Sequence, residues 1–414
     1  MARKQAPPAA SPPRITRIEV RNYRALRSVV LDDITPLTAL LGPNGSGKST
    51  LFDVFSFLSE CFTGGLRNAW DKRGRFRELR TRGTTGPIVF DLTYREHASE
   101  QPATYHLAID EGPSGPIVVE EWLKWRRVAK NAAGAPYRIL SFKNGRGWVI
   151  SGKHPDRTDF KVPEELDTPD LLAVSTLGQL ARNSRVAALR RFVTDWYVSY
   201  LSVDESRGQP DAGAQERLSK NGDNLANVIQ YLKERHPARL QQIFESLKER
   251  IPRLEKVDSV PMPNGQLLLT FKDAPFTEPI LARFASDGTL KMLAYLVVLH
   301  DPQPPPFIGI EEPENFLHPN LLPRLAEECR AASEAAQVLV TTHSPFLLNA
   351  LRPEEVRVLF RDDQGFTQTL RASAVVGVRE FMAAGASLGD LWMEGHFGAG
   401  DPLVASGGPT SSSK

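Results

Sequence analysis

A glycine-rich stretch at residues 41–50, LGPNGSGKST, limits what this 414-residue chain can fold into more than any other feature. It fits the pattern G-x-x-x-x-G-K-[ST], whose glycines let backbone N–H groups turn toward phosphate oxygens. The apolar run at 37–41 predicts a buried strand before it, and residues 49–62 predict an apolar helix after it. Strand, glycine loop and helix in this order aim a helix N-terminus at an anion, so the stretch predicts a nucleotide phosphate site.

Eight loop residues are candidate contacts to the nucleotide: Pro43, Asn44, Gly45, Ser46, Gly47, Lys48, Ser49 and Thr50. In such loops the lysine places a positive charge beside the β- and γ-phosphates, which is the role we assign to Lys48. The hydroxyl of the next residue, Ser49, is a candidate Mg²⁺ ligand. The sequence therefore predicts ATP and Mg²⁺ as cofactors.

A second apolar strand, predicted at 307–310, ends in the acids Glu311 and Glu312. A carboxylate at a strand end beside a phosphate loop can hold the Mg²⁺ shell, and its neighbour can orient or deprotonate the attacking water. We therefore expect Glu311 to bind the metal and Glu312 to act as the catalytic base. Glu311 stands where such motifs usually carry Asp, and its longer side chain leaves open whether it binds the metal directly or through water.

Two further segments are predicted to face the phosphates. A third apolar strand ends in His343, and a histidine at the end of the strand beside the acids would face the γ-phosphate as a catalytic residue. The residues Ser286, Asp287 and Gly288 open a predicted apolar helix at 290–299, with Ser286 as its N-cap. A capped helix N-terminus is an anion site, although this motif is weak by itself.

Three candidates rest on weaker patterns. Asn22 and Arg24 lie just upstream of the loop, where they can reach an adenosine, and a polar strand end explains them equally well. Gln179 lies in a helical stretch and is a candidate for the Mg²⁺-sensing glutamine of ATP-binding-cassette-like proteins; a surface position on a helix is the alternative. We count Asn22 and Arg24 among the nucleotide contacts and Gln179 among the metal contacts.

Strand and helix patterns divide the chain. Residues 86–150 alternate apolar and polar side chains, which indicates an antiparallel meander, and residues 169–254 carry apolar side chains at helical spacing. We expect an α/β P-loop NTPase with a mixed β-sheet core, an antiparallel β lobe and a helical insertion. The predicted parts are a disordered leader at 1–14, the first half of an ATPase head at 15–165, the helical insertion at 166–255, the second half of the head at 256–397, and a disordered tail at 398–414.

Composition leaves the partner open. Lysine and arginine total 51 against 49 acids, so the net charge of +2 neither favours nor excludes nucleic acid, and a DNA site would need a local patch. One candidate is the arginine-rich segment 67–82, with Trp70 and Phe76 interleaved; a solvated, mobile loop is the alternative. A second is the segment 122–127, WLKWRR, which a half-buried strand with a basic outer face explains equally well.

Several classes of protein are not favoured. The two cysteines lie outside any C-x-x-C pattern, which indicates neither a zinc site nor a disulfide framework. No apolar run reaches the length of a membrane span, and no signal-peptide pattern opens the chain. Together with the nucleotide loop, these features lead us to expect a cytoplasmic protein without a membrane partner.

In order along the chain, four motifs resemble the ATPase heads related to RecF, SMC proteins and OLD-family nucleases: RNYR with GPNGSGKST, then SDGT, then IEEPENFLHP, then TTHSP. The resemblance covers 15–360 and is closest to the stand-alone predicted ATPases of that group. It implies an ABC-ATPase-like head in which the phosphate loop and acids of one subunit face the signature motif of another. The residues Ser286, Asp287 and Gly288 would then act across a homodimer that sandwiches ATP. The chain departs from the pattern at Glu311 and in SDGT, where cassettes carry SGGQ.

The resemblance also limits what is attached to the head. No sustained heptads lie between Lys48 and Ser286, so we expect no long coiled-coil arms. Too little chain follows His343 for the nuclease domain of OLD proteins. We expect an ATPase that works as an ATP-dependent dimeric switch in DNA repair and maintenance or anti-phage defence, beside a separate effector protein. The rival interpretation is a non-catalytic, ATP-gated scaffold that binds DNA or a partner protein.

Overall fold

The computed structural model describes residues 12–97, 100–126, 128–129, 132–133, 135–213 and 215–398. Most of the predicted leader and nearly all of the predicted tail, at 1–11 and 399–414, lie outside these ranges. The predicted end of the leader differs from the structure, because Arg14 already opens the first strand and donates to the Ser333 carbonyl.

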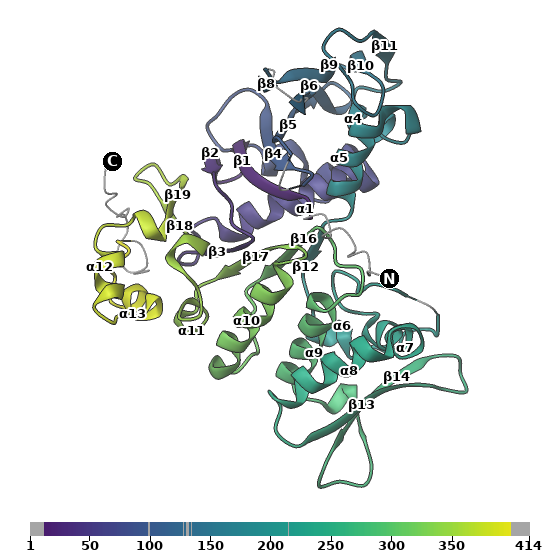
Figure 1. Cartoon of the computed structure of the whole chain (residues 1–414), viewed down its shortest axis with the longest axis vertical. Coiled ribbons are helices and arrows are strands. Elements are labelled where there is room, and N and C mark those ends of the chain that lie inside the picture. The colour runs from purple at the N-terminus through teal and green to yellow at the C-terminus, as the bar shows by residue number, and fades with distance from the viewer. Residues whose placement is uncertain are drawn as a thin grey trace, which may run out of the picture.

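A six-stranded sheet forms the centre of the molecule (Figure 1). Five neighbouring strands run parallel, and the last one pairs antiparallel. In sheet order they are β12 (Tyr197–Ser199), β16 (Phe307–Glu311), β17 (Gln337–Thr342), β3 (Leu37–Leu41), β18 (Val356–Arg361) and β19 (Thr367–Arg371). Every residue of β3 and β17 is buried, as expected for parallel strands covered on both faces. Because the strands are parallel, the residues that follow β3, β16 and β17 meet at one edge.

A second, eight-stranded antiparallel sheet forms the β lobe. In sheet order its strands are β11 (Lys161–Glu165), β10 (Arg146–Ile150), β9 (Tyr137–Lys143), β6 (Gly115–Trp125), β5 (Ala103–Gly112), β4 (Ile88–Arg95), β1 (Arg14–Tyr23) and β2 (Leu26–Leu31). The short strands β7 (Val128–Ala129) and β8 (Ala132–Ala133) form a separate pair. One face of β4 is fully buried while the other is partly exposed, which is why the sequence alternates there. The mixed core and antiparallel lobe expected from the sequence are confirmed.

Helix α1 (Lys48–Gly64) lies between the two sheets (Figure 1). Its apolar side chains contact both of them. Phe55 stacks on Phe307 of β16, with ring centroids 4.7 Å apart, and Phe57 lies 5.6 Å from Phe90 of β4. Four further helices pack beside it and the β lobe: α2 (Leu66–Asp71), α3 (Arg75–Leu79), α4 (Ala173–Leu177) and α5 (Ser184–Thr194). The helix that begins at the phosphate loop is therefore held on two sides by the core.

The helical insertion predicted at 166–255 is only partly right. Its middle contains β12, whose residues Tyr197, Val198 and Ser199 pair with β16 in the central sheet. The true helical lobe holds α6 (Val203–Ser206), α7 (Leu225–Arg235), α8 (Pro237–Lys248) and α9 (Asp287–Leu299), with a small sheet of β13 (Leu254–Pro261), β14 (Leu267–Asp273) and β15 (Ile280–Leu281). The difference arises because β12 is three residues long and has too few positions to show a strand period.

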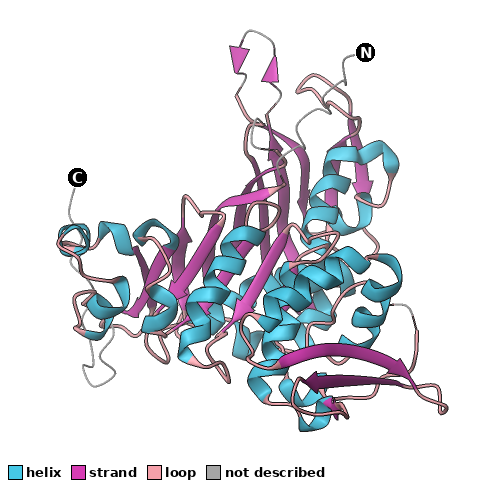
Figure 2. Cartoon of the chain, turned by 60° about the horizontal axis from the view of Figure 1, so that its bottom comes forward, coloured by secondary structure: helices cyan, strands magenta, loops and turns pink. Residues whose placement is uncertain are grey.

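The remaining helices lie beside the central sheet (Figure 1), and Figure 2 shows helices lying against strands. They are α10 (Leu322–Ala332), α11 (Pro345–Leu348), α12 (Val378–Ala383) and α13 (Leu388–Met393). Short 3₁₀ turns lie at η1 (Ala181–Asn183), η2 (Ala282–Phe284), η3 (Pro319–Leu321), η4 (Pro353–Glu355) and η5 (Ala372–Ala374). Within the described part of the chain, no helix combines the length and apolarity needed to cross a membrane.

Candidate nucleotide-binding site

The phosphate loop joins β3 to α1 in a conformation that only glycine adopts easily. Gly45 and Gly47 have φ of 79° and 104°, in the left-handed region. A side chain on Gly47 would collide with the Thr367 hydroxyl, whereas a Cβ on Gly45 would meet no atom within 4 Å. The loop is thus packed on its inner side and open where its exposed tip, Asn44 and Gly45, meets solvent. An anion can approach the backbone from that open side.

The hairpin of β18 and β19 supports the loop from behind. The Thr367 hydroxyl donates to the Ser46 carbonyl at 2.9 Å, and Arg361 Nε donates to the Gly45 carbonyl at 2.5 Å. These contacts occupy backbone carbonyls of the loop. Its N–H groups can then serve a phosphate, as in a preformed anion cradle.

Lys48 is buried beneath this loop. Its Nζ donates to the carbonyls of Gly42 at 2.7 Å and Pro43 at 3.2 Å. Burial lowers the pKa of Lys48, while the negative charges of Glu312, Glu314 and Glu311 act in the opposite direction. The ammonium therefore lies between the loop backbone and the acids that follow β16.

Ser49 and Glu311 meet as the sequence predicts for a metal site. Glu311 accepts a hydrogen bond from Ser49; burial raises the pKa of Glu311, and the charges of Glu312 and Asp53 act in the same direction. Protein Mg²⁺ sites commonly use one or two such oxygens, and phosphates and waters complete the shell. No group of three or more histidine, cysteine or acidic residues among the described residues is arranged to hold a metal by itself. The pair fits Mg²⁺ that arrives with a nucleotide.

Glu312 is fixed at the start of the turn after β16. Its backbone has φ of 39°, and its N–H donates to the Thr341 carbonyl at 3.1 Å and hydroxyl at 3.0 Å. Asn315 Nδ2 donates to one carboxylate oxygen at 3.2 Å, and His343 Nδ1 lies 3.8 Å from the other. The side chain remains partly open to solvent. This is the setting expected for a base that must reach a water molecule.

Glu314 belongs to the same group, although the sequence analysis did not name it. Its Oε1 accepts from the Thr342 hydroxyl at 2.9 Å and from the His343 N–H at 2.8 Å. The same oxygen lies 3.2 Å from His343 Nδ1. The sequence shows an acid two residues after Glu312, but the residues that Glu314 contacts, Thr342 and His343, are distant in the sequence.

The signature segment Ser286–Gly288 begins α9. The Ser286 hydroxyl accepts from the Thr289 N–H at 3.2 Å, so the predicted N-cap is confirmed. Asp287 forms an ion pair with Arg207, and a Cβ on Gly288 would lie 2.9 Å from the Phe316 carbonyl. Within one chain, this segment therefore lies against the turn that follows the acids.

Comparisons with known proteins agree with this geometry. The model of a family described as "AAA domain, putative AbiEii toxin, Type IV TA system" matches residues 37–114 and 145–349. The chain belongs to this AAA family. A search of curated proteins finds no match.

Solved structures similar to this AAA protein include heads of SMC proteins. A SmcHead bound to the C-winged helix domain of ScpA is 15% identical, covers 86% of this chain and 96% of its own, and gives a TM-score of 0.53. The SMC head domain from Thermotoga maritima is 12% identical, with coverages of 86% and 98% and a TM-score of 0.40. The Smc head from Pyrococcus yayanosii is 12% identical, with coverages of 89% and 100% and a TM-score of 0.48. The first match, with the family assignment, supports the fold of ABC-like P-loop ATPases of the SMC and RecF type.

Two upstream candidates of the AAA protein make contacts within the chain. Asn22 Nδ2 donates to the carbonyls of Thr85 at 3.3 Å and Pro87 at 3.0 Å. Arg24 pairs with Asp53 on α1 at 3.0 Å. These contacts match the alternative of a polar strand end, and a contact to adenosine stays a prediction for both residues.

Gln179 matches the alternative of a surface position. It lies in the exposed turn after α4, where its amide donates to the Ser175 carbonyl at 3.2 Å. The strand next to β16 is β12, and the residue after its carboxyl end is Tyr200. Tyr200 packs edge-on against Phe52 of α1, and burial raises the pKa of Tyr200 to about 12. The exposed position of Gln179 fits the alternative of a surface glutamine, and Mg²⁺ sensing by Gln179 stays a prediction.

The arginine-rich segment 67–82 is less available to a partner than its composition indicates. Arg73 is buried against Asp53 and Glu60, while Arg67 and Arg80 pair with Asp170 and Asp110. The side chains of Lys72 and Arg75 are exposed, and those of Arg77 and Arg82 are the most exposed, at 93% and 92%. Any contact to a polyanion would depend on these exposed arginines.

The second aromatic and basic candidate, at 122–127, splits between two faces of β6. Trp122 stacks on His106, with centroids 4.8 Å apart, and Lys124 lies over its ring at 4.5 Å. Trp125 is buried on the opposite face, and Arg127 lies outside the described residues. The alternative of a half-buried strand with a basic outer face fits this arrangement.

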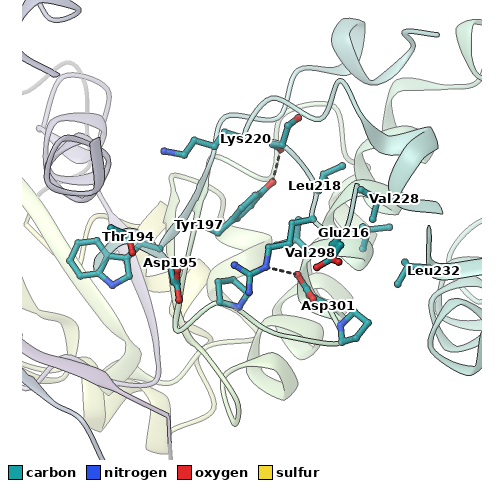
Figure 3. A pocket seen from close by; sticks show the side chains of 16 residues that line it. Thr194, Asp195, Tyr197, Glu216, Leu218, Lys220, Val228, Leu232, Val298 and Asp301 are labelled. Atoms are coloured by element: carbon teal, nitrogen blue, oxygen red, sulfur yellow. Dashed lines mark hydrogen bonds and ion pairs between the residues drawn. The ribbon is translucent and has the colours of Figure 1, made fainter. Parts of the chain in front are cut away.

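A separate cavity of about 230 Å³ lies at the amino end of β12 (Figure 3). Tyr197, Leu218 and Val298 contribute apolar walls, and Arg217 Nε lies 3.8 Å from Asp301. The phosphate loop and the acids lie at the carboxyl end of the same sheet, so this cavity is not part of the nucleotide site.

Proposed function

We propose that this AAA protein binds ATP with Mg²⁺ and hydrolyses it at the carboxyl edge of its central sheet. The observation that carries the proposal is the hydrogen bond between Ser49 and Glu311, with Glu312 held beside it by β17. Phosphoryl transfer to water requires oxygen ligands for a metal ion, a phosphate-binding loop and a carboxylate base close together, and this site has all three. The rival function, an ATP-gated scaffold without turnover, uses the same binding residues.

Each residue would have a distinct task. The loop N–H groups and Lys48 would hold the β- and γ-phosphates, and Ser49 and Glu311 would hold Mg²⁺, which neutralises charge on the phosphates. Glu312 would take the proton of the attacking water, and His343 would contact the γ-phosphate. A multiple-turnover phosphate-release assay separates this ATPase from the scaffold, because a scaffold releases at most about one phosphate per bound ATP.

We further propose that two chains close around two ATP molecules. Ser286 is exposed at the N-terminus of α9, with Phe284 and Phe316 beside it at 68% and 65% exposure. Exposed aromatic side chains around a polar anion site are typical of interaction surfaces. The γ-phosphate would then join the two subunits, so ATP would favour the closed dimer and hydrolysis would loosen it.

Light scattering with Glu312→Gln tests the dimer, since this variant should retain ATP. With ATP and Mg²⁺ we expect a dimer, and we expect a monomer when Ser286→Arg is added, because arginine fills the contact. Ser387→Arg is a matched control, since Ser387 caps α13 in the same way as Ser286 caps α9. Equal monomeric masses for Glu312→Gln with and without Ser286→Arg, at saturating ATP, would refute the sandwich.

The biological setting remains part of the proposal. The family description names a toxin of a toxin–antitoxin system, which supports a defence role over DNA maintenance. The similar SmcHead is bound to a domain of another protein, which supports a separate effector partner for this chain. DNA stays a candidate partner through Arg77 and Arg82, and the need for ATP favours the cytoplasm.

A further inference from the structure

Glu314 holds the end of β17 through a single oxygen. Its side chain is 8% exposed, and Oε1 accepts from the Thr342 hydroxyl and the His343 N–H while lying 3.2 Å from His343 Nδ1. The Thr342 hydroxyl in turn accepts from the Ser344 N–H at 3.0 Å. The backbone on both sides of His343 is therefore fixed relative to the acidic turn.

The hydrogen bonds to the backbone do not require a charge at this position. An amide oxygen would accept from the same N–H and hydroxyl, and burying a carboxylate costs more than burying an amide. Glu314 Oε2 is also buried without a hydrogen-bond partner within the described structure. A carboxylate is favoured here if it serves a cation or a proton-bearing nitrogen.

One ring nitrogen lies close to this carboxylate, since His343 Nδ1 is 3.2 Å from Glu314 Oε1. A more distant cation is Lys291 of α9, whose Nζ donates to the Asn315 carbonyl at 2.9 Å. Burial lowers the pKa of Lys291, and the charges of Glu314 and Glu312 act in the opposite direction. The carboxylate thus contacts the histidine after β17, and its charge also acts on the helix that carries the signature segment.

We propose that Glu314 is the positioning residue for His343. Its carboxylate would accept a hydrogen bond from Nδ1–H of His343 and so fix the orientation of the ring, with Nε2 directed toward the nucleotide. The inference rests on the proposed function for its catalytic consequence, and the contact itself can be tested without ATP. Histidine ring nitrogens differ in role, and the partner of one nitrogen sets the tautomer of the other. Glu314 acts through His343 and contacts no reacting atom.

The ring state is the first measurement. Protein labelled with ¹⁵N-histidine contains eight histidines, and the signals of His343 are assigned by their loss in His343→Ala. At about pH 8, where an ordinary imidazole is neutral, we expect a proton on Nδ1 in the wild type. We expect a shift of the proton toward Nε2 in Glu314→Gln, because a neutral amide oxygen accepts from Nδ1–H more weakly than a carboxylate does. The same ring pattern in both proteins would overturn the proposal.

Turnover is the second measurement. We expect Glu314→Gln to lower kcat by about tenfold and to leave KM within about twofold, since substrate binding is untouched. In the His343→Ala background the same substitution should change kcat by less than about twofold, because its target is gone. Losses that add in the double variant would show action by another route and would overturn the proposal.

Control variants distinguish the loss of the Glu314–His343 contact from misfolding and from a lack of ATPase activity. Glu394 lies 3.1 Å from His396 in an exposed pair, so Glu394→Gln makes the same chemical change and should leave kcat and the His343 signals unaltered. If Glu314→Gln fails to fold, Glu314→Asp keeps the charge but shortens its reach and should show the same ring shift. A wild type without phosphate release would refute the ATPase, and the ring pattern would still decide whether Glu314 holds His343.

Discussion

Two groups of acids lie along helix α1, and they differ in how their charge is balanced. Further along the helix, Asp53 and Glu60 are bound by Arg73, with distances of 2.8 Å and 3.0 Å. At its start, Glu311 and Glu312 lie beside Lys48, whose ammonium donates to backbone carbonyls instead. The helix thus connects a group of paired acids to a group whose neighbouring cation is engaged elsewhere.

The pKa shifts follow from this difference. Burial acts to raise the pKa of Glu60, but the hydrogen bonds and charge of Arg73 lower it overall. Burial raises the pKa of Glu311, and its acidic neighbours add to that effect. The paired acids stabilise the fold, whereas the crowded acids at the sheet edge are suited to a divalent cation, which would relieve their repulsion.

The largest effect is expected from removing the cation of the crowded group. Lys48→Ala should weaken ATP–Mg²⁺ binding by at least about a thousandfold, roughly 4 kcal/mol, because the phosphates lose their counter-charge. Isothermal titration measures this affinity. Lys72→Ala removes an exposed lysine near Glu60 and should leave binding unchanged. An unchanged ATP affinity in Lys48→Ala would contradict the claim that this loop binds the phosphates of ATP.

Breaking the paired group should act on stability instead. The Arg73 side chain is 9% exposed, so Arg73→Met leaves two acids without their buried partner and should destabilise the fold by about 4 kcal/mol. Urea unfolding gives this value. Arg75→Met removes an exposed pair with Asp71 and should cost less than about 1 kcal/mol. Equal losses for the two variants would contradict the structural role of the Arg73 network.

Glu121 sharpens the comparison, because hydrogen-bond donors rather than a cation surround it. It accepts from the N–H groups of Ala173 and Val174 and from the Tyr105 hydroxyl. Burial raises the pKa of Glu121 to about 7, so the folded state favours the protonated form. Its stabilisation is complete below the unfolded value near 4.5 and is lost as the pH rises through about 7.

Between these two pH values the unfolding free energy should fall by roughly 3 kcal/mol at most, since a pKa shift of one unit corresponds to about 1.36 kcal/mol. Glu121→Gln should remove this component of the pH dependence of the unfolding free energy. The difference between wild type and variant, measured by urea unfolding from pH 5 to about 8, isolates it from other titrating groups. A parallel dependence in both proteins would mean that Glu121 is ionised in the fold.

The smallest effect concerns the exposed arginines of the segment 67–82. Reversing Arg77 and Arg82 to glutamate should weaken DNA binding by about tenfold and lower the salt slope by about 2. Reversing Arg146 and Arg324 makes the same charge change at other exposed positions and should have a smaller effect. Fluorescence anisotropy at several salt concentrations measures both. Wild-type protein that binds no DNA at low salt would exclude this partner.

The sequence predicted the parts of the site that depend on local patterns. The loop, the apolar strands before Glu311 and His343, and the cap at Ser286 are each readable within about ten residues. β12 was missed because a strand of three residues is too short to show an alternating pattern. The role of Glu314 depends on a hydrogen bond to Thr342 on another strand, which no local pattern encodes.

Phosphate release by wild type and Glu312→Gln, with ATP and Mg²⁺ in excess, tests the central claim most directly. The amide can still orient water but cannot take its proton, so the account predicts many turnovers for the wild type and at least about a hundredfold slower release for the variant. ATP affinity of the two proteins should agree within about twofold. Wild-type turnover retained in Glu312→Gln, or a wild type that releases no more than one phosphate per chain, would contradict an ATPase that uses Glu312 as its base.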